Sequence, residues 1–263
     1  MRDAILNLLF PRGVCCMQCG EVRKMDMKNC LCDACRKELE GDRVPASSCE
    51  KCLSHVETGS KCSFCSSGGL DGIKQAYAPY LYANIARNLV LRLKFHCEAD
   101  GIPLLADAMA DSLKHRDFDV IVPVPLHIFR LKQRGFNQAM LLSEALSRRV
   151  QIPVTDVLKR VRATRPQSTL ARRDARIRNV ADAFRLKKDA DVSGLRILLV
   201  DDVRTSGNTA RACSRELLAN GAKEVSLCTA CAVWKYQEKR KKPGERQDID
   251  DGSLERKNGA AAG

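Results

Sequence analysis

Apolar positions along the chain alternate between helical spacing and short continuous runs. Between residues 83 and 115, Ile85, Leu89 and Leu93 recur four residues apart, and a second apolar set continues at intervals of three or four. This periodicity predicts two amphipathic helices that are interrupted near residues 99–101. The stretch "RGFNQAMLLSEALSRRV", residues 134–150, has the same spacing and predicts a third helix.

Three short runs have the continuous apolar character of strands that are covered on both faces. They are "DVIVPVPL", "LRILLV" and "VSLCTACAV", and a further helix is expected between the last two, from about Thr209 to Gly221. Such strands, alternating with helices, predict an α/β fold with a parallel sheet and helical crossovers. Ligands of such sheets bind at the carboxyl ends of the strands, so the residues that follow each run are candidates for a site.

The first 71 residues lack this alternation and are rich in cysteine instead. Ten of the fourteen cysteines lie between residues 15 and 65, and eight of them form CxxC pairs: Cys16/Cys19, Cys32/Cys35, Cys49/Cys52 and Cys62/Cys65. A CxxC turn can direct two thiolates at one ion, and two such turns complete a tetrahedral zinc site. We therefore predict two structural Zn2+ sites in a small module over residues 1–71, rather than disulfides or redox motifs.

The pairing of these turns is open from the sequence. Sequential pairing puts the first two turns on one ion and the last two on the other, whereas crossed pairing would interleave them; we favour the sequential arrangement. Cys15 and Cys30 are spare thiols that could replace a neighbouring ligand. A fifth CxxC, Cys228 and Cys231, lies in an apolar run and is interpreted as core cysteines rather than a metal site.

Positive charge is concentrated in one part of the chain. The formal net charge is +13, and residues 159–188 alone hold eleven Lys or Arg against two Asp. A basic loop of this kind suits nucleic acid, a small polyanion such as a pyrophosphate ester, or simply a solvated surface. Residues 235–263 mix both signs of charge with almost no apolar residues, so we predict a disordered tail there and a sheet domain over residues 72–234.

The hydropathy pattern also bears on location. No run approaches the roughly 18 to 20 apolar residues that a membrane span requires. The opening "AILNLLFP" is short and is followed by no small-residue cleavage site, so it is a poor signal peptide. We therefore expect a cytoplasmic protein without membrane insertion.

The segment "ILLVDDVRTSGNTA" carries the strongest candidate chemistry. Two carboxylates, Asp201 and Asp202, follow an apolar run and precede a cluster of small and hydroxyl-bearing residues at a predicted helix start. Backbone N–H groups and hydroxyls at such a start can surround a phosphate, and carboxylates can accept hydrogen bonds from a vicinal diol. The combination predicts a sugar phosphate as ligand, although an Asp-Asp pair before a helix is elsewhere most often a cap.

This segment resembles the ribose-5-phosphate motif of type I phosphoribosyltransferases. Together with "PVPLHIFRLKQRGFNQA", "RPQSTLARRDARIRNVADAF" and the four leading CxxC pairs, it is similar to the ComF family, also called GntX-like. In that family a double zinc ribbon precedes a phosphoribosyltransferase domain. The resemblance covers roughly Leu6 to Val233. Arg204 departs from the apolar or aromatic residue that is often found at its position.

The resemblance implies a site for phosphoribosyl pyrophosphate with Mg2+. Asp201 and Asp202 would hold the ribose hydroxyls, and the turn after them would hold the 5-phosphate. The pyrophosphate would lie near the turn at Pro125 and Leu126, and the basic loop would close over it as it leaves. The residues implied in binding, besides the two aspartates, are Val203, Thr205, Ser206, Gly207, Asn208, Thr209, Pro125, Leu126, Arg130 and Arg134. The loop arginines implied in catalysis are Arg172, Arg173 and Arg178.

Three functions are compatible with this pattern. The first is a phosphoribosyltransferase with an unidentified acceptor, and the second is a competence protein that handles single-stranded DNA or contacts other competence proteins. The third is a sensor that binds phosphoribosyl pyrophosphate without chemistry. Aromatic residues make up only 5% of the chain and the basic loop contains only Phe184, which weighs against a single-strand binder. Lys94 is either a substrate contact or the partner of a structural ion pair.

Overall fold

A parallel sheet forms the centre of the molecule. The computed structural model describes residues 15–22, 30–56, 60–95, 99–113, 117–162 and 182–234. Strands β1, β7, β6 and β3 follow one another across the sheet, β2 also pairs with β7, and every pairing is parallel. Their bounds are β1 (Ala76–Tyr77), β2 (Tyr80–Leu81), β3 (Val120–Pro123), β6 (Arg196–Arg204) and β7 (Glu224–Ala232). The predicted α/β fold with a parallel sheet is confirmed.

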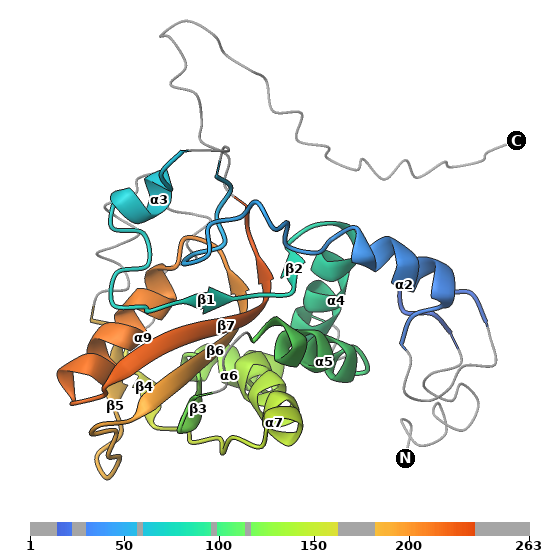
Figure 1. Cartoon of the computed structure of the whole chain (residues 1–263). Helices are drawn as coiled ribbons and strands as arrows, with labels where there is room; N and C mark the ends of the chain where they lie inside the picture. The colour runs from blue at the N-terminus through green and yellow to red at the C-terminus, as the bar shows by residue number, and fades with distance from the viewer. Residues whose placement is uncertain are drawn as a thin grey trace, which may run out of the picture.

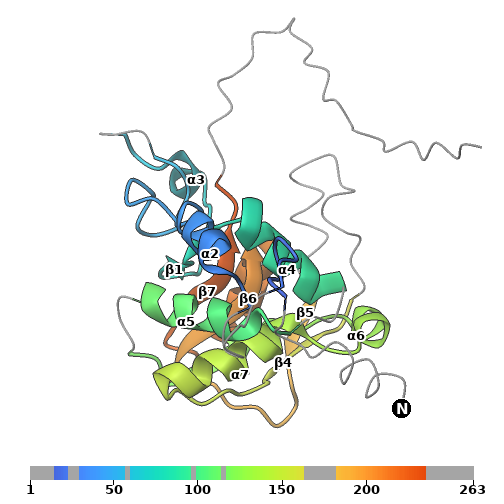
Figure 2. The same ribbon diagram turned by 90° about the vertical axis from the view of Figure 1, so that its right-hand side faces the viewer.

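Helices cover both faces of this sheet (Figures 1 and 2). One face carries α4 (Asn84–Phe95), α5 (Ile102–Ser112) and α7 (Gln138–Val150), and the other carries α9 (Asn208–Ala219). Alternate residues of β6 face opposite layers: Leu198 and Val200 pack in the core with α4, α5 and α7, whereas Ile197 and Leu199 pack in the core with α9. All four of these side chains have no exposed surface, which explains why the strand reads as a continuous apolar run.

The predicted helices are present, but the predicted end of β6 is wrong. The strand does not stop at Val200; it continues through both aspartates to Arg204. The reason is its neighbour β7, which supplies partners for the extra residues, pairing Thr229 with Asp201 and Ala232 with Arg204. A local apolar run cannot reveal how far a neighbouring strand extends.

The basic segment 159–188 is not a loop throughout. Its two ends form an antiparallel pair, β4 (Leu158–Arg160) with β5 (Phe184–Leu186). Leu158 and Phe184 are each 1% exposed and belong to the core that includes α9. Residues 163–181 between the two strands, with Arg172, Arg173 and Arg178, lie outside the described residues.

The N-terminal segment is joined to the sheet by backbone hydrogen bonds. The N–H of Val44 donates to the carbonyl of Pro79, and the N–H of Ala76 donates to the carbonyl of Lys51. Asp42 is 2% exposed, and its carboxylate accepts from the N–H of Ala86, so it supplies the first turn of α4 with an acceptor. Packing is therefore continuous across the boundary that we proposed at residue 71.

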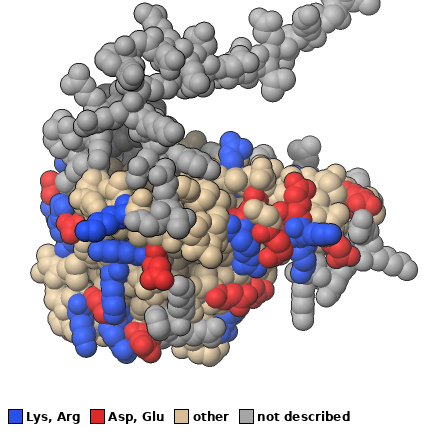
Figure 3. All heavy atoms as spheres, turned by 45° about the horizontal axis from the view of Figure 1, so that its top comes forward, with Lys and Arg blue, Asp and Glu red and all other residues tan. Residues whose placement is uncertain are grey.

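Three shorter helices complete the described fold. Two of them, α2 (Asp33–Glu40) and α3 (Ser63–Ser66), each contain one of the paired cysteines, and α6 (Ile128–Arg134) follows β3. On the face drawn in Figure 3, basic and acidic side chains are interspersed rather than gathered into one patch of a single sign. Within the described part of the chain, none of the helices has the length and apolar character to cross a membrane. The tail predicted over residues 235–263 lies outside the described residues.

Candidate ligand-binding cavity and metal centres

The eight paired cysteines form two groups of four. Cys16, Cys19, Cys32 and Cys35 make the first group; Cys49, Cys52, Cys62 and Cys65 make the second, and the ligand atoms in each lie within 4.8 Å of one another. Sequential pairing is therefore the arrangement that the fold adopts. Sulfur atoms of a tetrahedral Zn2+ site, with Zn–S bonds of about 2.3 Å, are about 3.8 Å apart. The measured separations are 3.8 Å for Cys19–Cys32 and 3.5 Å for Cys52–Cys62.

The surroundings of the two groups suit bound thiolates. The backbone N–H of Cys32 points at the Sγ of Cys16 at 3.3 Å. Cys32 and Cys62 are the N-cap residues of α2 and α3, where the helix dipole favours negative charge. Four thiolates without other donors are a typical structural zinc set, so the residues present fit two structural Zn2+ ions. Bound metal would add to the core contacts that these segments already make.

The other described cysteines do not belong to these groups. Cys15 is exposed and Cys30 is buried, and neither belongs to a group of four. Cys228 and Cys231 are fully buried in β7, and burial raises the pKa of both thiols, that of Cys228 to about 12. They are core cysteines, as the apolar run around them indicates.

A cavity of about 320 Å³ opens at the carboxyl end of β6. Its walls come from α4, α6, α7, α9, β4, β6 and the segments after β2, β3 and β6. The lining residues are Tyr82, Lys94, Val124, Pro125, Leu126, Arg130, Arg134, Asn137, Gln138, Ala139, Arg160, Asp201, Asp202, Val203, Thr205 and Thr209. The position agrees with the general rule that parallel sheets bind ligands at the carboxyl ends of their strands.

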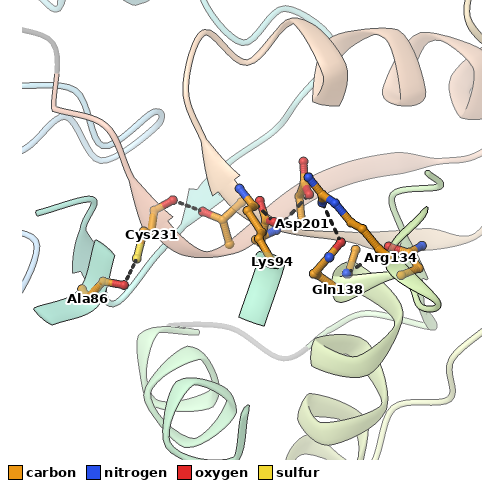
Figure 4. A network of polar contacts seen from close by, with 10 residues as sticks. Ala86, Lys94, Arg134, Gln138, Asp201 and Cys231 are labelled. Carbon is orange, nitrogen blue, oxygen red and sulfur yellow. Dashed lines mark hydrogen bonds and ion pairs between the residues drawn. The ribbon is translucent and has the colours of Figure 1, made fainter. Parts of the chain in front are cut away.

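The two adjacent aspartates have different environments in this cavity. Burial, and next the charge of Asp202, raises the pKa of Asp201 to about 7, although the backbone N–H of Asp202 donates to Asp201 Oδ1 at 2.9 Å. Asp202 is 8% exposed, and its Oδ2 lies 3.0 Å from the Nζ of Lys94. Lys94 is thus an ion-pair partner that also lines the cavity. Figure 4 shows Lys94, Asp201, Arg134 and Gln138 grouped together from four different elements.

The turn from Thr205 to Thr209 joins β6 to α9. Its centre, Gly207, is the N-cap of α9 with φ of +74°, and no side chain caps the helix there. The N–H of Asn208 donates to the hydroxyl of Ser206 at 3.5 Å, a long hydrogen bond that a ligand acceptor at the start of α9 could replace. A Cβ at Gly207 would overlap the Cδ2 of Leu70, so a larger residue would have to displace that side chain as well as adopt the left-handed backbone. Thr205, Gly207, Asn208 and Thr209 line a smaller cavity beside the turn.

Asn137 fixes the part of the cavity wall that lies between β3 and α7. Asn137 donates from Nδ2 to the carbonyl of Val124 at 3.0 Å, and its Oδ1 accepts from the N–H of Ala139 at 3.1 Å. Through these two hydrogen bonds it caps α7 and anchors the residue that follows β3. Arg134, at the end of α6, donates from Nη1 to Gln138 Oε1 at 3.2 Å. Pro125 and Leu126 lie along the chain between Val124 and Arg134, which these hydrogen bonds anchor.

Positive charge dominates the lining. Four basic side chains, Lys94, Arg130, Arg134 and Arg160, face two carboxylates. Burial lowers the pKa of Arg134 and also that of Arg160, which means that keeping these guanidinium groups charged here costs free energy. A ligand with several negative charges would offset that cost. The cavity is suited to a polyanion that also offers hydroxyl groups to the aspartates.

Most residues predicted from the sequence meet in one place. Nine of them line the large cavity: Asp201, Asp202, Val203, Thr205, Thr209, Pro125, Leu126, Arg130 and Arg134. Gly207 and Asn208 line the smaller cavity, and the hydroxyl of Ser206 lies 3.5 Å from the N–H of Asn208. The sequence analysis did not single out Tyr82, Asn137, Gln138 or Arg160 as site residues. Asn137 and Gln138 had a signal in the motif "PVPLHIFRLKQRGFNQA", and Arg160 had one in its place in the basic segment; Tyr82 had none.

Comparison with known proteins decides the family. The family model of the phosphoribosyl transferase domain matches residues 104–259. Competence protein F of Haemophilus influenzae is 31% identical over 210 residues, which cover 76% of this chain and 89% of that protein. The chain belongs to the ComF family. The fold is accordingly that of a type I phosphoribosyltransferase preceded by two four-cysteine groups.

Other ComF relatives match shorter parts of the chain. The DNA utilization protein YhgH of Escherichia coli K12 is 41% identical over 114 residues, which cover 43% of this chain. The chain spans about half of that relative's length, 49%. Competence protein ComFC of Bacillus subtilis is 29% identical over 161 residues, covering 60% of this chain and 64% of the relative.

Two solved phosphoribosyltransferases have a similar arrangement over half of the chain. Adenine phosphoribosyltransferase from Thermoanaerobacter pseudethanolicus matches with a TM-score of 0.33 and 21% identity, covering 50% of this chain and 69% of that one. Purine phosphoribosyltransferase from Pyrococcus horikoshii matches with a TM-score of 0.31 and 20% identity, covering 48% and 68%.

Proposed function

We propose that this ComF-family chain binds phosphoribosyl pyrophosphate with Mg2+ in the cavity at the end of β6 and transfers the phosphoribosyl group to an acceptor. One observation carries the proposal. The large cavity combines a carboxylate pair and four basic side chains with Thr205 and Thr209, which flank the start of α9, where Gly207 provides no side-chain cap. A sugar with a phosphate at one end and a pyrophosphate at the other needs that combination.

Each part of the ligand has a candidate partner. The ribose hydroxyls donate to Asp201 and Asp202, and the 5-phosphate accepts from the turn between Thr205 and Thr209. The pyrophosphate lies beside Pro125 and Leu126, within reach of Arg130 and Arg134. Mg2+, when bound with the ligand, neutralises charge on the pyrophosphate. Arg172, Arg173 and Arg178 remain candidates for contact with the leaving group.

The chemistry requires charge stabilisation rather than a protein nucleophile. The bond between ribose C1 and the pyrophosphate oxygen breaks, and its electron pair leaves with pyrophosphate. The acceptor's lone pair forms the new bond at C1. Positive charge that develops on the ring is stabilised by the carboxylates, and negative charge on the leaving group by the arginines. The two sets of side chains face the same cavity, as this separation of charge demands.

Transfer is tested by a pyrophosphate-release screen with nucleobases and amines, run with and without single-stranded DNA. We expect release above the hydrolysis background with at least one acceptor. Asp202→Asn should abolish it, and Asp156→Asn, at a surface ion pair with Lys187, should leave it unchanged. Binding without release for every acceptor would refute transfer and favour the sensor function.

A second function, handling of single-stranded DNA, has separate support. The relatives named above are called competence and DNA utilization proteins. On α6, Phe129 is 71% exposed and Ile128 is 51% exposed, next to Arg130 in the cavity wall. An exposed aromatic ring beside basic residues suits base stacking, worth about 1 to 3 kcal/mol per base. We expect Phe129→Ala to weaken binding of a labelled oligonucleotide about tenfold in anisotropy titrations at fixed salt; equal affinity would contradict this role.

A further inference from the structure

Arg204, the residue that departs from the family pattern, is buried at the start of the turn. It is the last residue of β6, is 2% exposed, and precedes Thr205 directly. Its Nη1 donates to the carbonyl of Thr205 at 3.4 Å, and its Nη2 donates to the carbonyl of Val233 at 3.1 Å. The guanidinium group is thus tied to the backbone of the turn and to the residue that follows β7.

The same guanidinium group faces the second cysteine group. It lies 5.9 Å from the ring centre of Phe64, which is in α3 between two cysteine ligands of that group. Burial lowers the pKa of Arg204, and the thiolates of Cys52 and Cys62 act in the opposite direction. Arg204 is therefore a buried cation within electrostatic reach of the metal-binding thiolates.

A second contact joins the same two regions. Leu70, five residues after Cys65, is 1% exposed, and its Cδ2 fills the space that a Cβ on Gly207 would need. Two residues further on, the carbonyl of Gly72 accepts a hydrogen bond from Ser214 in α9. The segment that leaves the second cysteine group is thereby packed against both the turn and the helix that the turn begins.

We propose that Arg204 is a positioning residue that couples metal binding in the second cysteine group to the conformation of the phosphate turn. A zinc site with four thiolates carries a net charge of about −2, so the site attracts the guanidinium group and holds it against Phe64. The guanidinium group in turn fixes the carbonyl of Thr205 and orients the turn. The ligand that the turn receives rests on the proposed function, but the coupling itself does not.

The coupling has a direct readout in the ligand-free protein. Hydrogen exchange of the amides in residues 205–209 measures how firmly the turn is held. In the full-length, zinc-loaded chain, we expect Arg204→Met to accelerate this exchange about tenfold, because it removes charge-assisted hydrogen bonds but keeps most of the side-chain volume. Arg204→Lys should be intermediate. Arg211→Met, on the first turn of α9, is the matched control and should leave the exchange unchanged.

Metal retention provides the reciprocal readout. Trp234 is the only tryptophan of the chain, and its ring lies 4.4 Å from that of His55, between the cysteine pairs of the second group. Its emission therefore reports on that group, while a chromogenic chelator measures zinc released from both. We expect zinc in the second group to leave about tenfold faster in Arg204→Met, and zinc in the first group to leave at the wild-type rate.

These measurements separate the two proposals. Wild-type exchange and wild-type zinc release in folded Arg204→Met would overturn the coupling, whatever the ligand. If both change as expected but the wild-type chain fails to bind phosphoribosyl pyrophosphate with Mg2+, the coupling stands and the proposed function fails. If wild type binds that ligand, Arg204→Met should weaken the affinity about tenfold, and Arg204→Lys should restore part of it. Unchanged affinity in Arg204→Met would also contradict the positioning role.

Discussion

Two neighbouring aspartates at the end of β6 illustrate how position decides the behaviour of a single residue. Asp202 has a cationic partner, Lys94, at 3.0 Å, and both side chains are mostly buried. The largest influence on Asp201 is burial, which together with the charge of Asp202 raises its pKa to about 7. The same residue type should therefore contribute to folding with opposite signs at adjacent positions.

Asp201 should destabilise the ligand-free fold near neutral pH. Its pKa rises from 3.8 to about 7 on folding, so between these values the folded state binds more protons than the unfolded state. The free energy of unfolding then falls as pH rises through that window, and the full cost is present above it. Asp201→Asn keeps the acceptor for the N–H of Asp202 and should raise Tm by several degrees at pH 8, measured by circular dichroism.

The advantage of Asp201→Asn over wild type should shrink as the pH is lowered from 8 towards 4. Loss of zinc at low pH affects both proteins alike and cancels in the difference. A Tm difference that does not depend on pH would contradict the assignment of this titration to Asp201.

Asp202→Asn should have the opposite effect. It leaves Lys94 mostly buried without its charged partner, which we expect to lower the free energy of unfolding by about 1 to 3 kcal/mol. Denaturant unfolding at pH 8 measures this change. The double variant with Lys94→Met should recover part of the loss, because it removes both charges together. Additive losses in the double variant would show that the pair is not coupled.

At this scale the sequence could predict the aspartates, but it left Lys94 open between a substrate contact and an ion pair and could not indicate which carboxylate Lys94 meets. An apolar run followed by two carboxylates is a local pattern. Lys94 lies more than a hundred residues earlier, on a helix whose contact with β6 depends on how the whole layer packs. Asn137 is similar: its dual bond to Val124 and Ala139 depends on the path of the chain between β3 and α7.

Among the elements, the turn before α9 leaves little space for a side chain at its glycine. Gly207 has φ of +74° and is packed against Leu70, whereas Gly194 has φ of +72° and no heavy atom within 4 Å of the position that a Cβ would take. Comparing substitutions at these two glycines therefore separates the cost of backbone strain from the cost of displaced packing. The left-handed conformation costs a non-glycine residue roughly 1 to 2 kcal/mol.

We expect Gly194→Ala to lose only that strain energy and to keep wild-type ligand affinity. Gly207→Ala should lose at least about 1 kcal/mol more, because the added methyl group displaces Leu70, and should bind phosphoribosyl pyrophosphate weakly or not at all. Urea unfolding and calorimetry measure the two effects. Equal stability and equal affinity in the two variants would contradict the packing described for the turn.

Element boundaries show where pattern reasoning from the sequence ends. The helical spacing around Leu89 predicted α4, because that helix buries one stripe of its surface. The short pair β4 and β5 was missed, since Lys159 and Arg185 in the middle of each strand are charged and conceal the buried Leu158 and Phe184. The extension of β6 to Arg204 was missed for the related reason that β7 determines it.

In the whole molecule, the two cysteine groups are attached to opposite faces of the sheet. Cysteines of the first group share a core with α4, α5 and α7, and Cys52 of the second group belongs to the core with α9. The cysteine spacing predicted two metal sites, but it held no information about which core each would join. Metal in these groups would stabilise contacts of the sheet as well as the segments that supply the thiolates.

Zinc removal should therefore lower the stability of the entire described fold. With a chelator present, far-ultraviolet circular dichroism should show a single thermal transition at a lower Tm. The reason is that metal bound to the folded state adds to the free energy of unfolding. Magnesium added back should not restore it, whereas Zn2+ should. Two separate transitions, with that of the sheet unshifted, would instead indicate an autonomous module before residue 71.

The proposed ligand is tested most directly by calorimetric titration of the zinc-loaded chain with phosphoribosyl pyrophosphate and Mg2+. The cavity at the end of β6 predicts one binding event per chain in wild type and in Asp156→Asn, and its loss in Asp202→Asn. No binding heat in folded wild-type protein, or the same affinity in Asp202→Asn, would contradict the assignment of this cavity to phosphoribosyl pyrophosphate.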